Sequence, residues 1–240
     1  MLRYLLLFVA GSIFLGCGRS TSAGLSSGEI EAVFAISAGR GPDVSCEAVF
    51  RQGAGKDALL VELSGGDKVF CSDGVNKVAL DAKPAPYGGA TYQSTTLVFD
   101  SLRKYRMIFE RGNSERFETE IALPQPPKIL TPAEGINLKK GDQITVTWTK
   151  VEQAFVAPII YWTVDNNDIT AFYDKYLEDN GTYTFPDAAS LPRHEEGSRV
   201  AGAVPIKIQL IRRLAATHPV GLRGSSVGLY SQDFSINLVD

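Results

Sequence analysis

Apolar and polar residues alternate along most of the chain with the period of two that is typical of β-strands. In the first such run, Ile30, Phe34 and Ile36 share one face with Ala32, and Glu29 and Glu31 lie on the opposite face. Similar runs recur to the end of the chain, whereas helical spacing is rare. The pattern therefore predicts an all-β fold.

Two pairs of neighbouring runs are predicted to form hairpins. Residues 58–63 and 68–71 flank a Ser-Gly-Gly-Asp turn. Residues 104–111 and 115–123 place aromatic and aliphatic side chains on one face and Arg and Glu on the other. Opposite charges on facing strands favour cross-strand ion pairs, so we expect a solvated face there and no basic binding patch.

A proline-rich stretch at residues 124–132, with four prolines, is the best candidate for a domain boundary. It separates residues 29–123 from residues 133–240, and each part offers about seven short strands, as a small β-sandwich does. We expect two antiparallel β-sandwich domains that each fold alone, joined by this linker. Residues 158–164 are apolar on both faces, which predicts a central strand in the second domain.

The amino terminus has the pattern of an export signal. One arginine precedes an apolar run of 12 residues from Tyr4 to Leu15, which is shorter than the roughly 20 residues that a membrane-spanning helix needs. The sequence Phe14-Leu15-Gly16-Cys17 resembles a bacterial lipobox, in which a small residue precedes a cysteine that is acylated and becomes the new amino terminus. An ordinary signal peptide with an incidental cysteine is the alternative.

The lipobox resemblance implies that residues 1–16 are removed and that lipid on Cys17 anchors the protein to the membrane. Residues 17–28 are small and polar, so we expect a flexible tether there. Gly18 follows the cysteine, and by resemblance to Gram-negative lipoproteins this favours the outer membrane. Two cysteines remain, Cys46 and Cys71, and an even pair in an exported chain predicts a disulfide, with two free thiols as the alternative.

Short motifs resemble immunoglobulin-like and fibronectin-III-like domains. Residues 126–132 and 141–148 look like the proline-rich opening and the tryptophan-bearing strand of such a domain, and residues 179–186 resemble a strand start that bacterial surface domains share. Residues 99–105 resemble a tyrosine corner, which implies that the Tyr105 hydroxyl bonds nearby backbone. No tryptophan lies between the paired cysteines, so the resemblance does not require their disulfide to join two sheets.

Composition changes the picture mainly by exclusion. The 240 residues carry 24 basic and 27 acidic side chains, a net charge of −3, which gives no electrostatic case for nucleic-acid binding. Ser226 and Ser26 each match the Gly-x-Ser-x-Gly pattern of hydrolases, but Ser26 lies in the expected tether and both histidines precede Ser226. We therefore expect no enzyme and no cofactor.

Two polar clusters could hold a metal, and for both a loop is the better interpretation. His194 is followed by Glu195 and Glu196 in a turn-rich stretch. Residues 165–168 offer oxygen ligands without the spacing of a calcium-binding EF-hand loop. We expect a surface loop at the first cluster, a hairpin loop at the second, and no metal site.

Aromatic residues are concentrated between Tyr161 and Phe185, where seven of the 23 lie. Tyr173 and Tyr176, with Asp168 and Asp174 beside them, are our candidate binding surface, because aromatics beside carboxylates can stack on sugars or anchor a partner. A core built of Tyr and Phe is the alternative. Trp148 and Phe185 are predicted core residues, and residues 169–177 fit either a short helix or a strand.

Taken together, the sequence predicts a lipid-anchored, non-catalytic cell-envelope protein. Its partners would be the membrane, through Cys17, and an envelope protein or a glycan. An accessory subunit of an envelope assembly or secretion machine is the first alternative. An envelope-polymer hydrolase is the less favoured one.

Overall fold

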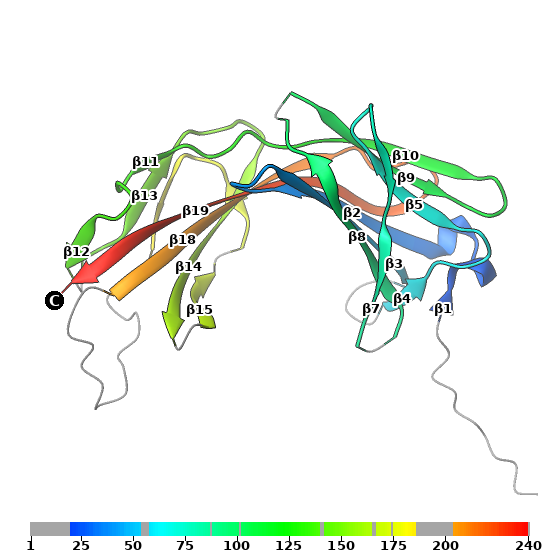
Figure 1. Ribbon diagram of the computed structural model, residues 1–240, viewed down its shortest axis with the longest axis horizontal. Helices are drawn as coiled ribbons and strands as arrows, with labels where there is room; N and C mark the ends of the chain where they lie inside the picture. The colour runs from blue at the N-terminus through cyan, green and yellow to red at the C-terminus, as the bar shows by residue number, and fades with distance from the viewer. Residues whose placement is uncertain are drawn as a thin grey trace, which may run out of the picture.

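The computed structural model describes residues 20–53, 58–86, 88–100, 102–139, 142–164, 167–173, 175–185 and 204–239, with the backbone alone at 162–173 and 204. Nearly all of this is β-structure, which confirms the predicted class. No helix in these residues is long and apolar enough to cross a membrane. The strands form two lobes that meet at an angle, so that the molecule has an arched outline (Figure 1).

The first lobe is a sandwich of a four-stranded sheet against part of a twelve-stranded sheet. The four-stranded sheet has the order β10-β9-β5-β6. Its strands are β5 (Lys68–Ser72), β6 (Lys77–Ala79), β9 (Lys104–Glu110) and β10 (Arg116–Ala122). The large sheet contributes β1 (Ser20–Thr21), β2 (Ile30–Ala38), β3 (Asp43–Gln52), β4 (Leu59–Glu62), β7 (Asp81–Pro84) and β8 (Ala90–Val98). Two short 3₁₀ helices, η1 (Ser22–Gly24) and η2 (Ser27–Glu29), precede β2.

The second lobe packs a three-stranded sheet against the other part of the same large sheet. The small sheet consists of β11 (Ile129–Thr131), β13 (Thr145–Trp148) and β17 (Thr182–Thr184). The large sheet continues through β12 (Asn137–Lys139), β14 (Phe155–Val164), β15 (Asn167–Tyr173), β16 (Leu177–Glu178), β18 (Val204–Ala216) and β19 (Arg223–Val239). Trp148 and Phe185 are buried in this second core, as predicted.

A long antiparallel hairpin, β18 with β19, joins the lobes. The first half of β19 pairs in parallel with β2, from Arg223 opposite Glu31 to Tyr230 opposite Ala38. Its second half carries Phe234 and other residues of the second core, while Leu222 and Tyr230 belong to the first. One sheet therefore serves both cores, which the local pattern did not predict. The boundary at residues 124–132 stays a prediction.

Two glycines let β19 lie against neighbouring backbone. A Cβ on Gly224 would come within 1.8 Å of the Ala32 carbonyl oxygen, and one on Gly228 within 2.1 Å of the Ala122 carbonyl oxygen. Ala122 ends β10, where the chain leaves the first lobe. The glycines that create the Gly-x-Ser-x-Gly match thus have a packing reason of their own.

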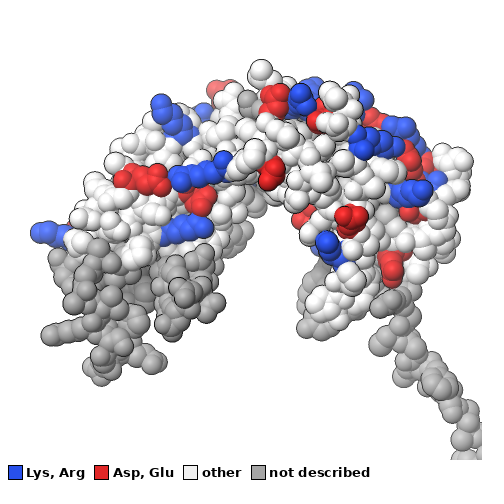
Figure 2. Space-filling model, viewed as in Figure 1, with Lys and Arg blue, Asp and Glu red and all other residues white. Residues whose placement is uncertain are grey.

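The predicted hairpins had different outcomes. β9 and β10 pair as expected, with Tyr105 opposite Ile121, and ion pairs such as Lys104–Glu120 at 2.6 Å cover the outer face. Figure 2 shows both charge signs interspersed over this lobe. The prediction of a hairpin at residues 58–71 is wrong. β4 pairs with β3 in the large sheet, whereas β5 pairs with β9 in the four-stranded sheet. The Ser-Gly-Gly-Asp turn crosses from one sheet to the other.

Two finer expectations hold, and one open alternative is decided. The sequence of residues 169–177 fits either a helix or a strand, and residues 167–173 form a strand. β14 is central, between β15 and β18. The Tyr105 hydroxyl donates to the Val98 carbonyl at 2.9 Å and accepts from the Asp100 amide at 3.0 Å, as the tyrosine-corner resemblance implied.

Candidate functional site

The segment from Ser20 to Glu29 is bound to the first lobe, which differs from the flexible tether that we expected. β1 pairs in parallel with β4, with Ser20 opposite Val61. The Ser20 hydroxyl donates to the Gln52 side chain at 2.7 Å. Ser22 is fully buried and Leu25 packs against the first core. The small polar composition predicts a flexible linker, but the hydroxyls and carbonyls of these residues are hydrogen-bonded to the lobe.

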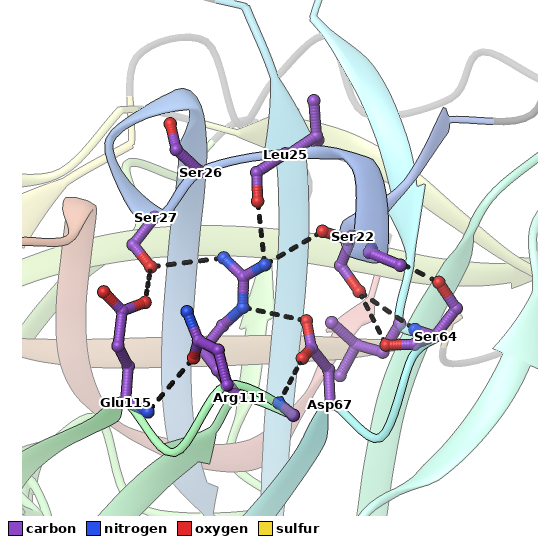
Figure 3. A network of polar contacts seen from close by, with 12 residues as sticks. Ser22, Leu25, Ser26, Ser27, Ser64, Asp67, Arg111 and Glu115 are labelled. Atoms are coloured by element: carbon purple, nitrogen blue, oxygen red, sulfur yellow. Dashed lines mark hydrogen bonds and ion pairs between the residues drawn. The ribbon is translucent and has the colours of Figure 1, made fainter.

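One arginine holds this segment (Figure 3). From the loop after β9, the Arg111 Nη2 donates to the carbonyls of Ser22 at 2.9 Å and Leu25 at 2.8 Å. Its Nη1 donates to the Ser27 hydroxyl at 3.2 Å. Its Nε lies 3.0 Å from the Asp67 carboxylate, and the two side chains are only 6% and 3% exposed. We call these five residues the clasp.

Further hydrogen bonds connect the clasp to the turn after β4 and the turn after β9. The Asp67 carboxylate also accepts from the Gly112 amide at 2.8 Å, so the turn after β4 is joined to the turn after β9. The Ser64 amide donates to the Ser22 hydroxyl at 2.9 Å. Because the guanidinium has several partners in a fixed arrangement, it orients the segment as well as binding it.

Two glutamates complete the outer side of the segment. The Glu29 carboxylate accepts from the Ser26 amide at 2.9 Å, which is the side-chain hydrogen bond from Glu29 in a capping box at η2, and also from the Ser26 hydroxyl at 2.7 Å. These hydrogen bonds, the one from the Ser26 hydroxyl first, lower the pKa of Glu29. The hydroxyl of Ser27 likewise donates to Glu115 and lowers the pKa of that carboxyl. Both glutamates are therefore ionised and fixed at neutral pH.

The predicted disulfide is present. Cys46 in β3 is bonded to Cys71 in β5, with the Cα atoms 6.4 Å apart. Because β3 belongs to the large sheet and β5 to the four-stranded sheet, the bond does join the two sheets of the first lobe. The sequence left that open.

The other predicted site residues are described only in part. Cys17 and Asp174 lie outside the described residues, and the side chains of Asp168 and Tyr173 in β15 do too. Tyr176 is half-buried, and the Arg213 guanidinium carbon lies 5.3 Å from the centre of its ring. The candidate binding surface of Tyr173, Tyr176, Asp168 and Asp174 stays a prediction.

His218 and Ser226 are hydrogen-bonded, although the order of these residues in the sequence does not fit a hydrolase. His218 lies in the turn between β18 and β19, and its Nδ1 is 2.9 Å from the Ser226 hydroxyl. Its Nε2 is 3.1 Å from the Arg223 carbonyl, so Nε2 carries the proton and Nδ1 accepts from the serine. Ser226 is only 4% exposed, and the ring packs 5.8 Å from that of Phe34. This geometry closes the hairpin turn and buries the hydroxyl.

His218 also lines a groove of about 500 Å³ between β10 and the hairpin turn, with Thr119, Lys104 and Glu120 on the other side. The Thr119 hydroxyl donates to the carbonyl of Thr217 there. Burial lowers the pKa of His218, and the hydrogen bond with the Arg223 carbonyl opposes this in part. The imidazole is therefore neutral at neutral pH.

A second buried arginine, which the sequence reasoning missed, organises the second lobe. Arg212 in β18 is fully buried, and its Nε lies 2.9 Å from the Asp179 carboxylate. Its Nη1 donates to the Gln125 carbonyl at 2.6 Å, and its Nη2 to that of Thr149. The indole of Trp148 donates to Asp179 at 2.7 Å. The cluster fixes the proline-rich stretch against β18, and desolvation lowers the pKa of Arg212.

Metal ligation gains no support from the part of the chain that the structure describes, where no cluster of His, Cys, Asp or Glu could hold an ion. His194, Glu195 and Glu196 lie outside it, so the expectation for that loop stays untested.

Comparisons with known proteins find only distant similarity to solved structures. No protein-family model matches the chain, and no curated protein matches it. The fibronectin(III)-like modules of CbhA from Clostridium thermocellum match with 12% identity over 88% of this chain and 93% of that one, at a TM-score of 0.23. The DIP-gamma IG1+IG2 structure matches with 11% identity over 88% and 95%, at 0.23. Chicken CNTN1 FN1-FN3 matches with 12% identity over 86% and 65%, at 0.25. Scores this low carry no argument about this chain.

Proposed function

We propose that the protein is a lipid-anchored component of the bacterial cell envelope, and that its two β-sandwich lobes act as a binding or structural module without catalysis. The anchor would be lipid on Cys17 after removal of residues 1–16, and the outer membrane would be its location.

The observation that carries this proposal is the clasp. A segment that begins three residues after the predicted acylation site is held by a buried guanidinium, a buried carboxylate and a parallel strand pair. A lobe that binds its own amino-terminal segment in this way is suited to holding an anchor. The disulfide between Cys46 and Cys71 agrees with an oxidising, exported location.

The binding role rests on the second lobe. We propose that Tyr173 and Tyr176, with Asp168 and Asp174, contact an envelope protein or a glycan. Tyr176 lies at the edge of the large sheet, directly before β16, where a partner could reach it.

Cell fractionation of a Cys17→Ser variant tests the proposal. We expect wild-type protein in the membrane fraction and the variant in soluble or unprocessed form. A Ser20→Ala variant, which keeps the cysteine, is the matched control and is expected to stay in the membrane fraction. Membrane-bound, correctly cleaved Cys17→Ser protein would overturn the anchor.

A further inference from the structure

The distance between the predicted lipid and the folded lobe is short. β1 begins at Ser20, so three residues from Cys17 onward span at most about 10 Å of extended chain. A flexible tether over residues 17–28 would instead have a root-mean-square length of about 20 Å. With the clasp in place, the lobe has little freedom to move away from the lipid.

The register of β1 shows which part of the lobe faces the anchor. β1 runs parallel to β4, with Ser20 opposite Val61 and Thr21 opposite Glu62. The chain therefore arrives from the side on which Leu59 lies, two residues before Val61. Figure 1 shows β1 at the foot of the first lobe.

Leu59 is a large apolar side chain that is 60% exposed at that point. Exposed leucines are common on protein surfaces, and one alone means little. At the place where a lipid-bearing chain leaves the lobe, however, the interfacial region of a bilayer offers an apolar environment that favours its burial.

We propose that this end of the first lobe rests on the bilayer surface, with Leu59 in contact with lipid, and that the clasp fixes the protein in this orientation. The inference rests on the proposed lipid anchor and deepens it, because it names the surface that meets the membrane. The second lobe lies at the other end of the arch from β1 (Figure 1).

Fluorescence quenching in vesicles tests the orientation. The chain has three cysteines, of which Cys46 and Cys71 are bonded to each other and Cys17 would carry lipid. A Leu59→Cys variant therefore offers one free thiol for a small fluorophore. The mature full-length protein is reconstituted in phosphatidylethanolamine–phosphatidylglycerol vesicles with or without brominated acyl chains, which quench at short range.

Val98 supplies the matched control, because it is also 60% exposed and lies in the same lobe. Leu59 is opposite Gln52 at one end of β3 and Val98 is opposite Asp43 at the other. Nine residue steps of a strand separate these ends by about 30 Å. We expect brominated lipid to remove most of the fluorescence at position 59 and to leave position 98 unchanged.

A second variant tests the role of the short connection. Insertion of a long Gly/Ser linker between Arg19 and Ser20 leaves the clasp intact, and we expect it to reduce quenching at position 59 to the level at position 98. Intact mass establishes the lipid on the same samples. Protein without lipid would overturn the proposed function and this inference with it. Lipidated protein with equal quenching at both positions would overturn the inference alone.

Discussion

Arg111 and Arg212 occupy positions that the alternating pattern assigns to apolar side chains. Arg111 continues the inward series of Tyr105, Met107 and Phe109, and Arg212 follows Ile206, Ile208 and Leu210 in the same way. A charged residue at the next inward position of an apolar series is a sequence signal that identifies both arginines as candidate buried residues. Its meaning depends on the partners, Asp67 and Asp179, which no local pattern supplies.

Removal of Arg111 is predicted to weaken the first lobe. An Arg111→Met variant leaves the Asp67 carboxylate buried without its cation, which costs about 3–5 kcal/mol in comparable cases. The control is Arg116→Met, which removes an ion pair of 2.7 Å with Glu118 on the exposed face and is expected to cost less than about 1 kcal/mol. Chemical denaturation measures both free energies of unfolding.

Hydrogen exchange gives an independent readout for the same pair of variants. We expect the amides between Ser22 and Glu29 to exchange faster in Arg111→Met and to keep their protection in Arg116→Met. Similar unfolding free energies and similar exchange in the two variants would show that the clasp does not hold the segment.

His218 predicts a pH dependence of stability. Its pKa in the folded protein lies below the ordinary value of 6.5, so between these two values the unfolded chain binds more protons than the folded one. The stabilising contribution is therefore present above about pH 6.5 and is lost as the pH falls through that window. Denaturation at pH 7.5 and pH 5.5 should show a loss in the wild type that is smaller in His218→Asn.

The two exposed glutamates beside the clasp do not obscure this window. Glu29 and Glu115 have pKa values lowered below 4.5 in the fold, so their contributions decline only in more acidic solution. Lys104 and Glu120, which line the same groove as His218, are retained in both proteins. An unchanged pH slope in His218→Asn would mean that the imidazole is not responsible.

At the scale of elements, local pattern predicted strands well and their partners less well. Residues 104–123 form the expected hairpin because apolar and charged faces coincide across a tight turn. Residues 58–71 have equally good strands and turn, yet the two strands join different sheets. The turn sequence permits either a hairpin or a crossing between sheets. Burial decides between them, because each of the two strands covers one side of the first core.

Because β19 lies close to neighbouring backbone, the addition of a single methyl group is predicted to lower the free energy of unfolding strongly. A Gly228→Ala variant places a Cβ against the Ala122 carbonyl at the point where β10 ends. Overpacking typically costs about 1–3 kcal/mol, and rigid backbone on both sides favours the upper part of that range. Gly41→Ala is the control, since a Cβ there meets nothing within 4 Å.

Thermal unfolding of the two glycine variants checks this expectation. We expect a clearly lower midpoint for Gly228→Ala and little change for Gly41→Ala. If both variants melt like the wild type, β19 does not pack against the end of β10 as described.

At the scale of the whole molecule, the sequence predicted an all-β chain with two cores but not the strand pair that unites them. Glu31 and Arg223 are opposite each other in neighbouring strands although they lie near opposite ends of the sequence. Local periodicity carries no information on such a distant partner. The same limit applies to the segment from Ser20 to Glu29. The prediction for Cys17 rests on its immediate neighbours in the sequence, whereas the clasp depends on Arg111, far away in sequence.

The shared hairpin leads us to expect one cooperative unfolding transition for the full chain. Phe50→Ala in the first core and Phe234→Ala in the second each remove a buried aromatic ring, at about 3–5 kcal/mol. Calorimetry should show both variants shifting the same single transition. Two transitions, each moved by one variant only, would instead support halves that fold independently on either side of residues 124–132.

The measurement that tests the central claim most directly is the mass of the amino-terminal peptide of the mature protein. The account predicts that residues 1–16 are absent and that the peptide begins at Cys17 with a diacylglyceryl group on sulfur and an acyl chain on nitrogen. A mature chain that begins elsewhere, or an unmodified Cys17, would contradict it.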